Sequence, residues 1–551
     1  MSNKKRFGSA PSAGPKKGIQ VQEKTAKKIG LFASVAILFN CICGTGIFFK
    51  NRSIFVNNHG NAVGVLVTWL LLTFIAFATA YSYIEISKVK TKVDDSGISG
   101  YYERYVGNRS SRFIKLIYPL FYWGIFVVVM SVFASEALLN IFPQVWVTDS
   151  SGNKLPGTIG GFSFAIVLLI GLAMSIFFLT LNFISKMVLP TISQKLSYVK
   201  FFALSFITIG AIVLFAKHPD YNIITNIDNS PDESLNSLSG QFNFSSVLTS
   251  APAVLFAYDG FLVIGLLKSD VKNPDKTIPL SMILGMLLAG FVFIFITVCQ
   301  LLCGCASPYL IFDKLIPNNN VLRNVFIEII SILIFVSLFS SLNSQVLGQT
   351  RSCQAAIDEE IIFGYRWFKR ISNGRRSDLF GGTVCSLMST IFWFILTGVP
   401  AIIINSDQII DGFGNLVVLA IFVIYGVLPF FTLPRWCKVP TNEAKHERLQ
   451  PITAVIGGVG CIGVPLYVGV GQFIINIIHD PFGPNTEWGL WYSGNVMTNL
   501  QGCIIFWITF VLLFALPLTN DLLLRHYDRE YKQPFVWQKG DPKHFDVRFN
   551  G

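Results

Sequence analysis

Long apolar stretches alternate along this chain with short polar segments that are rich in charge, proline, glycine or asparagine. A helix needs about 20 mostly apolar residues to cross a bilayer, and twelve stretches approach or exceed that length. They lie near residues 29–49, 62–86, 114–141, 158–182, 196–216, 246–267, 279–304, 321–349, 380–400, 412–433, 451–478 and 502–519. The pattern therefore predicts an all-α integral membrane protein with twelve transmembrane helices.

Basic residues are distributed unevenly between the polar segments. Of the 43 Lys and Arg residues, 36 fall in the two tails or in alternate loops on the same predicted side. Only six fall on the other side, namely Lys50, Arg52, Lys154, Lys217, Lys314 and Arg323. Because basic loops stay cytoplasmic, both termini are predicted to be cytoplasmic in a multi-pass protein of the cell membrane. Lys200 is then the single basic residue inside a predicted span.

Composition excludes other classes of protein. The chain of 551 residues is 52% hydrophobic and only 13% charged, whereas a soluble domain carries about 25% charged residues. This hydropathy excludes a soluble enzyme and a disordered chain, and it makes nucleic acid an unsuitable partner for the net charge of +12. Motifs for ATP binding, zinc proteolysis and acyl transfer are absent from the sequence, and the cysteines lack nearby histidine or carboxylate ligands. We therefore expect no enzyme activity, no cofactor and no metal site.

Two of the apolar stretches are interrupted by polar and glycine residues, at 40–48 and at 255–261. Unwound backbone is tolerated in a bilayer only where it lines a protein-enclosed or watery cavity, and the free N–H and C=O groups of the half-helices suit a zwitterion. Paired interruptions of this kind indicate the binding site of a transporter. Gly44 and Gly46 could instead allow close helix packing, but Asp259 in the matching stretch favours function, because a buried carboxylate is costly.

The interrupted stretches also resemble a known family. The segment Gly44-Thr45-Gly46-Ile47-Phe48 resembles the first-helix signature of amino acid permeases of the amino acid–polyamine–organocation (APC) superfamily. Further similar segments are Tyr83–Ile86, Ser96–Tyr101, Asn182–Lys200, Phe256–Phe261, Lys272–Pro279 and the residues Asn343, Gly348 and Arg351. The resemblance covers residues 28–435, and it departs at Ser269-Asp270, where many members carry two glutamates.

This resemblance implies a five-plus-five inverted repeat of the LeuT type, with broken helices 1 and 6. The transport core would occupy residues 28–435, helices 11 and 12 residues 436–519, and flexible or polar cytoplasmic tails residues 1–27 and 520–551. An amino acid would bind between the two broken helices. The implied site consists of backbone at Cys43, Gly44, Thr45 and Gly46 for the carboxylate, carbonyls of Phe256, Ala257 and Asp259 for the ammonium, and the side chains of Tyr258 and Phe261 as walls or gates.

Lys200 is the candidate coupling residue. A lone lysine in an apolar helix needs carbonyl partners or must extend its side chain to the interface, and Lys195 nearby makes the second arrangement an alternative. In similar sodium-independent permeases a lysine at this place bridges helices 1 and 8, where sodium-coupled relatives hold a cation. Because burial disfavours the charged form of a lysine, Lys200 is also a candidate carrier of a proton.

The sequence thus predicts a secondary active amino acid transporter that works by alternating access, in exchange or with proton symport. Few acidic residues fall in the implied site, which favours neutral substrates, whereas Asp259 facing the site would favour cationic amino acids or polyamines. An amino acid sensor without transport, a channel and a membrane-embedded enzyme are the other classes considered. Amino acid, protons and the lipid bilayer are the expected partners. Glu136, late in the third predicted helix, has no assigned role.

Overall fold

The computed structural model describes most of the chain. The described residues are 28–44, 46–88, 98–148, 154–159, 164–184, 188–232, 235, 238–262, 264–265, 271–317, 320–375, 377–405, 407–436, 450–483 and 498–527. Within these ranges, eleven helices are long and apolar enough to cross a membrane, and Phe244–Tyr258 forms a shorter apolar pair of helices. The shorter pair corresponds to the sixth predicted span, so the prediction of a multi-pass helical membrane protein is confirmed.

Helices 1 to 5 make up the first half of the core, and helices 1 and 3 consist of several segments. The first half comprises α1 (Leu31–Ile42), η1 (Gly46–Lys50) and α2 (Asn51–Asn57) as helix 1, α3 (Ala62–Lys88) as helix 2, α5 (Asn108–Ile117), η2 (Tyr118–Tyr122) and α6 (Trp123–Leu139) as helix 3, α7 (Phe164–Asn182) as helix 4 and α8 (Val188–Lys217) as helix 5. A short helix, α4 (Ile98–Tyr105), precedes α5.

Helices 6 to 10 make up the second half, in which helix 6 is the segmented one. They comprise α10 (Phe244–Thr249) and α11 (Ala251–Tyr258) as helix 6, α12 (Pro274–Cys303) as helix 7, α14 (Asn320–Asp358) as helix 8, α16 (Phe380–Ile404) as helix 9 and α17 (Gln408–Trp436) as helix 10. Connecting helices are α13 (Pro308–Leu315) between helices 7 and 8, and α15 (Tyr365–Ser372) between helices 8 and 9.

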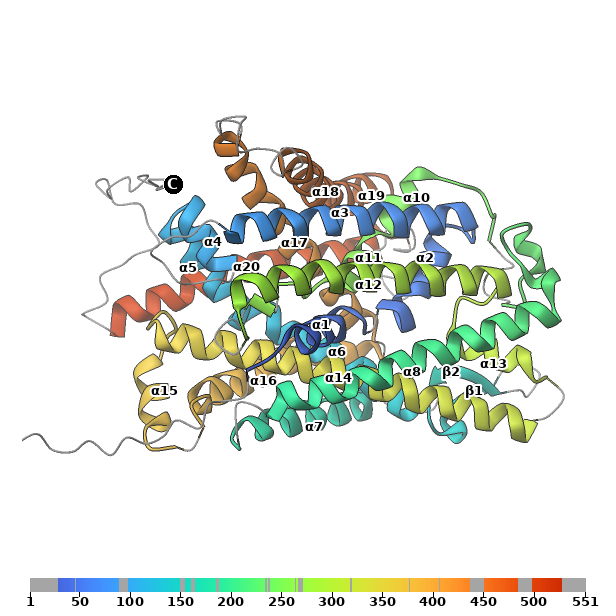
Figure 1. Cartoon of the computed structure of the whole chain (residues 1–551), viewed down its shortest axis with the longest axis horizontal. Coiled ribbons are helices and arrows are strands. Elements are labelled where there is room, and N and C mark those ends of the chain that lie inside the picture. Colours follow the sequence, from blue (N-terminus) through green and yellow to red (C-terminus); the bar gives the residue numbers. More distant parts are fainter. Residues whose placement is uncertain are drawn as a thin grey trace, which may run out of the picture.

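The two halves repeat the same packing. Helix 1 packs on helices 5 and 7, and helix 6 packs on helices 10 and 2, which are the equivalent partners in a five-helix repeat. Helices 3 and 4 pack together as helices 8 and 9 do, and α3 runs beside α12 (Figure 1). Because each half has an odd number of spans, the second half begins on the opposite side of the membrane and is inverted relative to the first. The structure therefore has the predicted five-plus-five inverted repeat.

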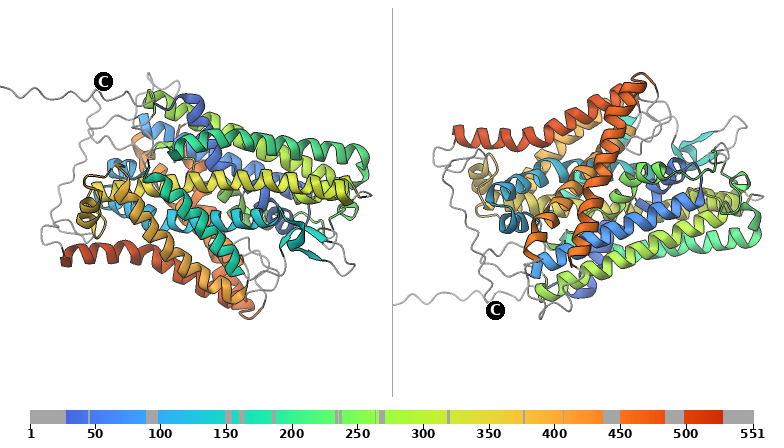
Figure 2. Two further views of the ribbon diagram at one scale, coloured as in Figure 1. Left: turned by 90° about the horizontal axis from the view of Figure 1, so that it is seen from below. Right: turned by 90° about the horizontal axis from the view of Figure 1, so that it is seen from above.

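Helices 11 and 12 lie outside this core. Helix 11 consists of α18 (Gln450–Val470), η7 (Gly471–Ile475) and α19 (Asn476–His479), and helix 12 is α20 (Asn499–Tyr527). α20 runs along the outside of the bundle (Figure 2) and contacts α5, η2, η7 and α19. Its last turns enter the segment that was predicted to be a tail from residue 520. The tail segments 1–27 and 528–551 lie outside the described residues.

The two ends of the bundle differ in charge and structure. We call the end that carries Lys115, Lys369 and Arg370 the basic end, and the opposite end, which carries Lys217 and Arg323, the far end. A two-stranded antiparallel hairpin of β1 (Trp146–Thr148) and β2 (Lys154–Ile159) lies at the far end, and α15 lies at the basic end (Figure 1). The hairpin was not predicted, because its strands are short and follow no long apolar pattern.

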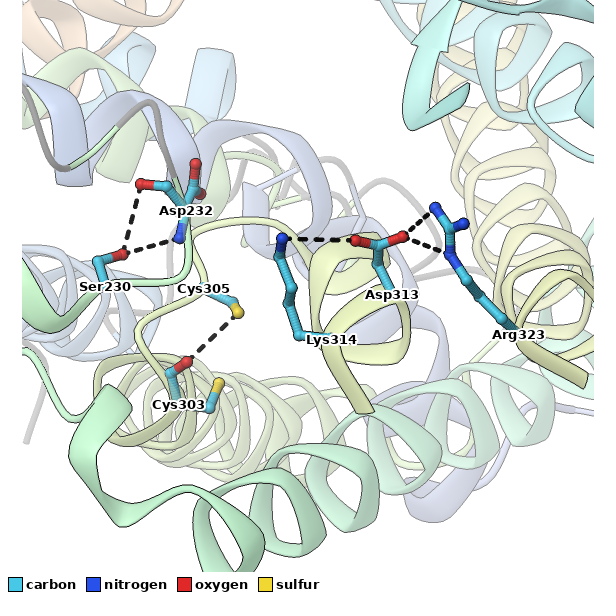
Figure 3. A network of polar contacts seen from close by, with 7 residues as sticks. All are labelled: Ser230, Asp232, Cys303, Cys305, Asp313, Lys314 and Arg323. Carbon is cyan, nitrogen blue, oxygen red and sulfur yellow. Dashed lines mark hydrogen bonds and ion pairs between the residues drawn. The ribbon is translucent and has the colours of Figure 1, made fainter. Parts of the chain in front are cut away.

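Polar contacts fix the loops at the far end (Figure 3). The Ser230 hydroxyl donates to the carbonyl of Gly304 at 2.7 Å, which holds the segment after helix 5 against the end of helix 7. Gly304 has a φ of 63°, and a Cβ there would lie 2.3 Å from the carbonyl oxygen of Tyr221, so glycine is required. The Cys305 thiol lies 3.3 Å from the carbonyl oxygen of Cys303, so both cysteines pack within this turn.

One boundary prediction is wrong in a way that matters for function. The first span was predicted to end at residue 49, with Lys50 and Arg52 in an outer loop, but helix 1 continues to Asn57. Trp69 donates to the Asn51 side chain at 3.0 Å, and Asn51 donates to Gln300, so this polar residue is satisfied inside the bundle. Lys200 is therefore not the only basic residue within a span, because Lys50 is another.

Candidate substrate site between helices 1 and 6

Helix 1 is broken next to its glycine motif. α1 ends at Ile42, and Cys43 leaves the helical conformation with φ −85° and ψ 84° before η1 begins at Gly46. The Cys43 N–H still donates to Phe39 at 2.7 Å, and the Gly44 N–H donates to Ile42 at 3.1 Å. Thr45 lies outside the described residues. Carboxylate binding by this segment stays a prediction, in which the first N–H groups of η1 would be the donors.

Helix 6 is broken at its aspartate. α11 ends at Tyr258, Asp259 is extended with φ −67° and ψ 154°, and Gly260 has a φ of 90°. A residue with a side chain rarely adopts that φ value, so Gly260 allows the chain to turn away from the helix axis. The Phe256 carbonyl accepts the Asp259 N–H at 3.4 Å, and the carbonyls of this last turn lose the partners four residues on that a continuing helix would supply. These are the carbonyls that the resemblance assigns to the substrate ammonium.

The two breaks meet directly. A Cβ on Gly46 would lie 2.3 Å from the Cβ of Ala257, and a Cβ on Gly44 would lie 2.5 Å from the Ser341 hydroxyl of helix 8. Real Cβ atoms do not approach so closely, so Gly46 is required for packing on Ala257, whereas a side chain at Gly44 would displace the Ser341 hydroxyl. The same packing places the broken segment of helix 1 against the broken segment of helix 6. The packing and binding interpretations of the glycine motif are therefore compatible.

Lys200 joins helix 5 to helices 1 and 8 beside the break of helix 1. Its side chain is 0% exposed, and the ammonium donates to the carbonyls of Asn40 at 2.8 Å and Cys43 at 2.6 Å and to the Ser341 hydroxyl at 2.8 Å. The three acceptors come from helix 1 and helix 8. The Lys200 side chain therefore lies on the break of helix 1 and does not extend toward the basic end.

Lys50 forms a second buried cluster, on the far side of the breaks. Its side chain is 2% exposed and pairs with Asp411 of helix 10, while the ammonium donates to Asn415 at 2.7 Å. The ammonium also lies 4.6 Å from the centre of the Phe256 ring and 5.8 Å from that of Phe133, within the range of cation–π attraction. This cluster ties the second half of helix 1, after the break, to helix 10 and to helix 6.

The aromatic residues predicted as walls face other helices. Tyr258 is buried, shares a hydrogen bond of 2.6 Å with Thr73 of helix 2, and packs its ring on Trp69. Phe261 packs on Tyr425 of helix 10, with ring centres 5.2 Å apart. Phe256, predicted only for its carbonyl, is the residue whose ring contacts the Lys50 cluster. The assignment of Tyr258 and Phe261 as walls or gates stays a prediction.

A pocket enters the bundle from the basic end and reaches the break of helix 6. It is lined by Ile98, Ser99, Lys115, Tyr118, Tyr122, Trp123, Gly260, Leu262, Ser352, Ala355, Ala356, Glu359, Ile361 and Tyr425. At its mouth, Lys115 pairs with Glu359 at 2.7 Å. At its inner end, Tyr122 of helix 3 donates to the Asp259 carboxylate at 2.5 Å. The pocket thus leads from the surface to the unwound segment of helix 6.

Sequence reasoning missed several residues of this region, namely Lys50, Tyr122, Asp411, Asn415 and Tyr425. The charge of Lys50 directly after the glycine motif was a usable signal, because a helix that resumes after a break carries the next residues into the membrane. The tyrosines offered no such signal, since aromatic residues are common at every depth of a membrane protein.

Comparison with known proteins finds relatives that are described as amino acid exchangers or transporters. The serine/threonine exchanger SteT of Bacillus subtilis (strain 168) is 24% identical over 329 residues, which are 59% of this chain and 67% of SteT. Amino acid transporter protein 6 of Caenorhabditis elegans is 25% identical over 60% of each chain. The human b(0,+)-type amino acid transporter 1 is 25% identical over 51% of this chain and 53% of its own length. The matched part thus spans about half to two thirds of these relatives.

A solved structure and a family model complete the comparison. The crystal structure of MhsT in complex with L-phenylalanine aligns with 79% of this chain and 97% of MhsT, at 12% identity and a TM-score of 0.47. The family model described as amino acid permease matches residues 29–514. The chain therefore belongs to the amino acid permease family.

Proposed function

We propose that the protein is a secondary active transporter that carries neutral amino acids by alternating access, without sodium. The observation that carries this proposal is the contact of two broken helices at Gly46 and Ala257, near the start of η1 and the end of α11. A zwitterion between them would receive N–H donors for its carboxylate from η1 and carbonyl acceptors for its ammonium from α11. Such a site binds and releases its ligand unchanged, so we expect transport and no enzymatic turnover.

Alternating access is supported by the unequal state of the two ends. The pocket on the basic-end side reaches Gly260, whereas Lys50 and Asp411 join helices 1 and 10 on the far side. If the basic end is cytoplasmic, as the positive-inside rule implies, this conformation is open to the cytoplasm and closed to the outside. The opposite conformation would require the Lys50–Asp411 pair to separate and helices 1 and 6 to move. We place the protein in the plasma membrane with both termini cytoplasmic.

Sodium independence is supported by the position of Lys200. Its ammonium occupies the space between helices 1 and 8 and is bound there by carbonyl and hydroxyl oxygens, the ligands that a sodium ion would require. A cation that is covalently part of the chain does not need to be replaced from solution in each cycle. Amino acid exchange and proton symport are both compatible with this arrangement.

Cationic amino acids are the alternative substrates, and one observation favours them. Asp259 lies beside the pocket, and none of the ion pairs found among the described residues includes it. A substrate ammonium or guanidinium could supply the missing positive charge. Neutral substrates remain the proposal, because Tyr122 already occupies one oxygen of this carboxylate.

Flux measurements on the purified full-length protein in proteoliposomes test the proposal. Labelled leucine, methionine, serine, arginine and glutamate are supplied outside, with and without internal amino acid, in sodium and in choline buffer. We expect saturable uptake of a neutral amino acid, equal in both buffers. Binding without flux would identify a sensor, and flux that does not saturate would identify a channel. Uptake restricted to arginine would establish the cationic alternative.

A further inference from the structure

Asp259 is a buried carboxylate without a positively charged partner. Its side chain is 3% exposed, its Oδ2 atom accepts the Tyr122 hydroxyl, and its Oδ1 atom has no hydrogen-bond partner in the structure. None of the lysine, arginine and histidine side chains in the described ranges lies within ion-pair distance of it. Burial of an ionised carboxylate in this state is costly, so the group requires a positive charge that the structure does not supply.

The groups around Asp259 come from several helices and are all neutral or distant. Helix 3 contributes Tyr118 and Tyr122, and helix 10 contributes Tyr425, whose carbonyl accepts the hydroxyl of Tyr83 of helix 2 at 3.3 Å. Helix 1 contributes Cys41, which lies close enough to interact with both Asp259 and Lys200. The Lys200 ammonium itself is bound by two carbonyls and a hydroxyl.

Three of these tyrosines connect the carboxylate to the surface. Tyr118, Tyr122 and Tyr425 line the pocket that opens at the basic end, whereas Asp259 does not. Tyr118 donates to the Tyr425 hydroxyl at 3.2 Å, so the hydroxyl groups form a polar layer between the pocket and the carboxylate. Ions and substrates in the pocket meet this layer first, but a proton can cross it by transfer between hydroxyl groups and water.

We propose that Asp259 is a proton-binding site that is loaded from the basic-end pocket through the Tyr122 hydroxyl. In this step a hydronium ion in the pocket gives a proton to the Tyr122 oxygen while Tyr122 gives its own proton to Oδ2 of Asp259. The products are water, an unchanged tyrosine and a neutral carboxylic acid. The proposal rests on the proposed function. It makes Asp259 of helix 6 a carrier of the coupling proton, in addition to the candidate Lys200 of helix 5.

Neutralisation of Asp259 has a structural consequence. The ionised carboxylate holds the unwound segment of helix 6 to Tyr122 through a charge-assisted hydrogen bond, which is stronger than a bond between neutral groups. The neutral acid holds it less tightly. Since the Asp259 side chain and the substrate-facing carbonyls belong to the same short segment, proton binding would change the mobility of the substrate site.

The pH dependence of neutral amino acid flux tests this proposal in proteoliposomes with equal pH on both sides. From about pH 5 to about pH 8, the range in which a buried carboxyl group can titrate, we expect the flux of the unmodified protein to change severalfold. Asp259→Asn should flatten that profile and keep flux measurable. The matched control is Glu359→Gln, which removes a carboxylate at the mouth of the same pocket and should leave the profile unchanged.

Three results of the flux experiment would overturn the proposal. They are a flat profile in the unmodified protein, an unmodified profile in Asp259→Asn, and a loss of arginine uptake alone in Asp259→Asn. The third result would make Asp259 the counter-charge of a cationic substrate. Lys200→Ala, measured in parallel, shows whether any remaining pH dependence belongs to the lysine.

A second measurement does not require transport. Infrared difference spectroscopy of the purified protein between acid and neutral pH should show the C=O band of a protonated carboxyl group, and Tyr122→Phe should shift this band because it removes a hydrogen bond to Asp259. A band that Tyr122→Phe leaves unchanged would contradict the assignment. If no amino acid is transported by the unmodified protein, the proposed function fails, whereas the infrared titration still decides whether Asp259 binds a proton.

Discussion

The Lys50 ammonium lies 4.6 Å from the centre of the Phe256 ring, so the closure of the far end rests directly on the broken segment of helix 6. Phe256 also stacks on Phe126 of helix 3, with ring centres 5.2 Å apart. A substrate that displaces the end of α11 would therefore change the surface on which Lys50 rests. This contact gives a physical route from substrate binding to the separation of Lys50 from Asp411, since Phe256 belongs to the broken segment of helix 6 and also contacts the Lys50 ammonium.

The first prediction concerns this closure. Asp411→Asn removes the charge partner of Lys50, whose side chain is 2% exposed, and we expect it to destabilise the closed far end by about 3 kcal/mol, as for other broken buried ion pairs. Access of an impermeant thiol reagent to a cysteine introduced at Val56 should increase. The control is Asp313→Asn, which breaks the pair with Arg323 at the same end of the bundle and should leave access unchanged. Equal labelling in the two variants would show that Lys50 and Asp411 do not close the site.

The second prediction concerns Lys200. Lys200→Ala leaves the carbonyls of Asn40 and Cys43 without their donor and removes the link between helices 5, 1 and 8, so we expect amino acid flux to fall by about tenfold or more. Lys195→Ala, on an exposed position of the same helix, should retain flux. If sodium restores flux to Lys200→Ala and not to the unmodified protein, the ammonium stands in place of a bound cation. Full flux in Lys200→Ala would reduce its role to that of a structural side chain.

The local features of the site could be predicted from the sequence, because each disturbs an otherwise apolar helix. The glycines of helix 1, Asp259 in helix 6 and Lys200 in helix 5 are all unfavourable in a continuous membrane helix, so their presence indicates a compensating environment. The five-plus-five arrangement was available only through the family resemblance, since hydropathy gives the number of spans and their direction without saying which helices pack together.

Features that depend on partners far away in the chain could not be predicted in this way. Lys50 and Asp411 are separated by 361 positions and Tyr122 and Asp259 by 137, and no local pattern reports such a pairing. Hydropathy therefore ended helix 1 at the first charged residue, although the charge is satisfied inside the bundle.

The third prediction tests the contact between the broken helices. Gly46→Ala places a Cβ 2.3 Å from the Cβ of Ala257, and overpacking of this kind costs about 1–3 kcal/mol. We expect lower thermal stability and strongly reduced flux. Ala257→Gly removes the clashing methyl group, so the double variant should recover part of both properties. Gly463→Ala, where a Cβ would meet nothing within 4 Å, is the control for a glycine in a membrane helix. A double variant no better than Gly46→Ala would place the strain elsewhere.

The last prediction concerns orientation, on which the assignment of the open and closed ends depends. Asn229 is exposed at the far end and Arg370 is exposed on α15 at the basic end, so cysteines at these positions should react with water-soluble reagents. The nine native cysteines in the described ranges are buried, and labelling of the unmodified protein gives the background. With intact cells and a membrane-impermeant maleimide, we expect labelling of Asn229→Cys and not of Arg370→Cys, with both labelled after permeabilisation. The reverse pattern would place the basic end outside, and the conformation described here would then be open to the outside.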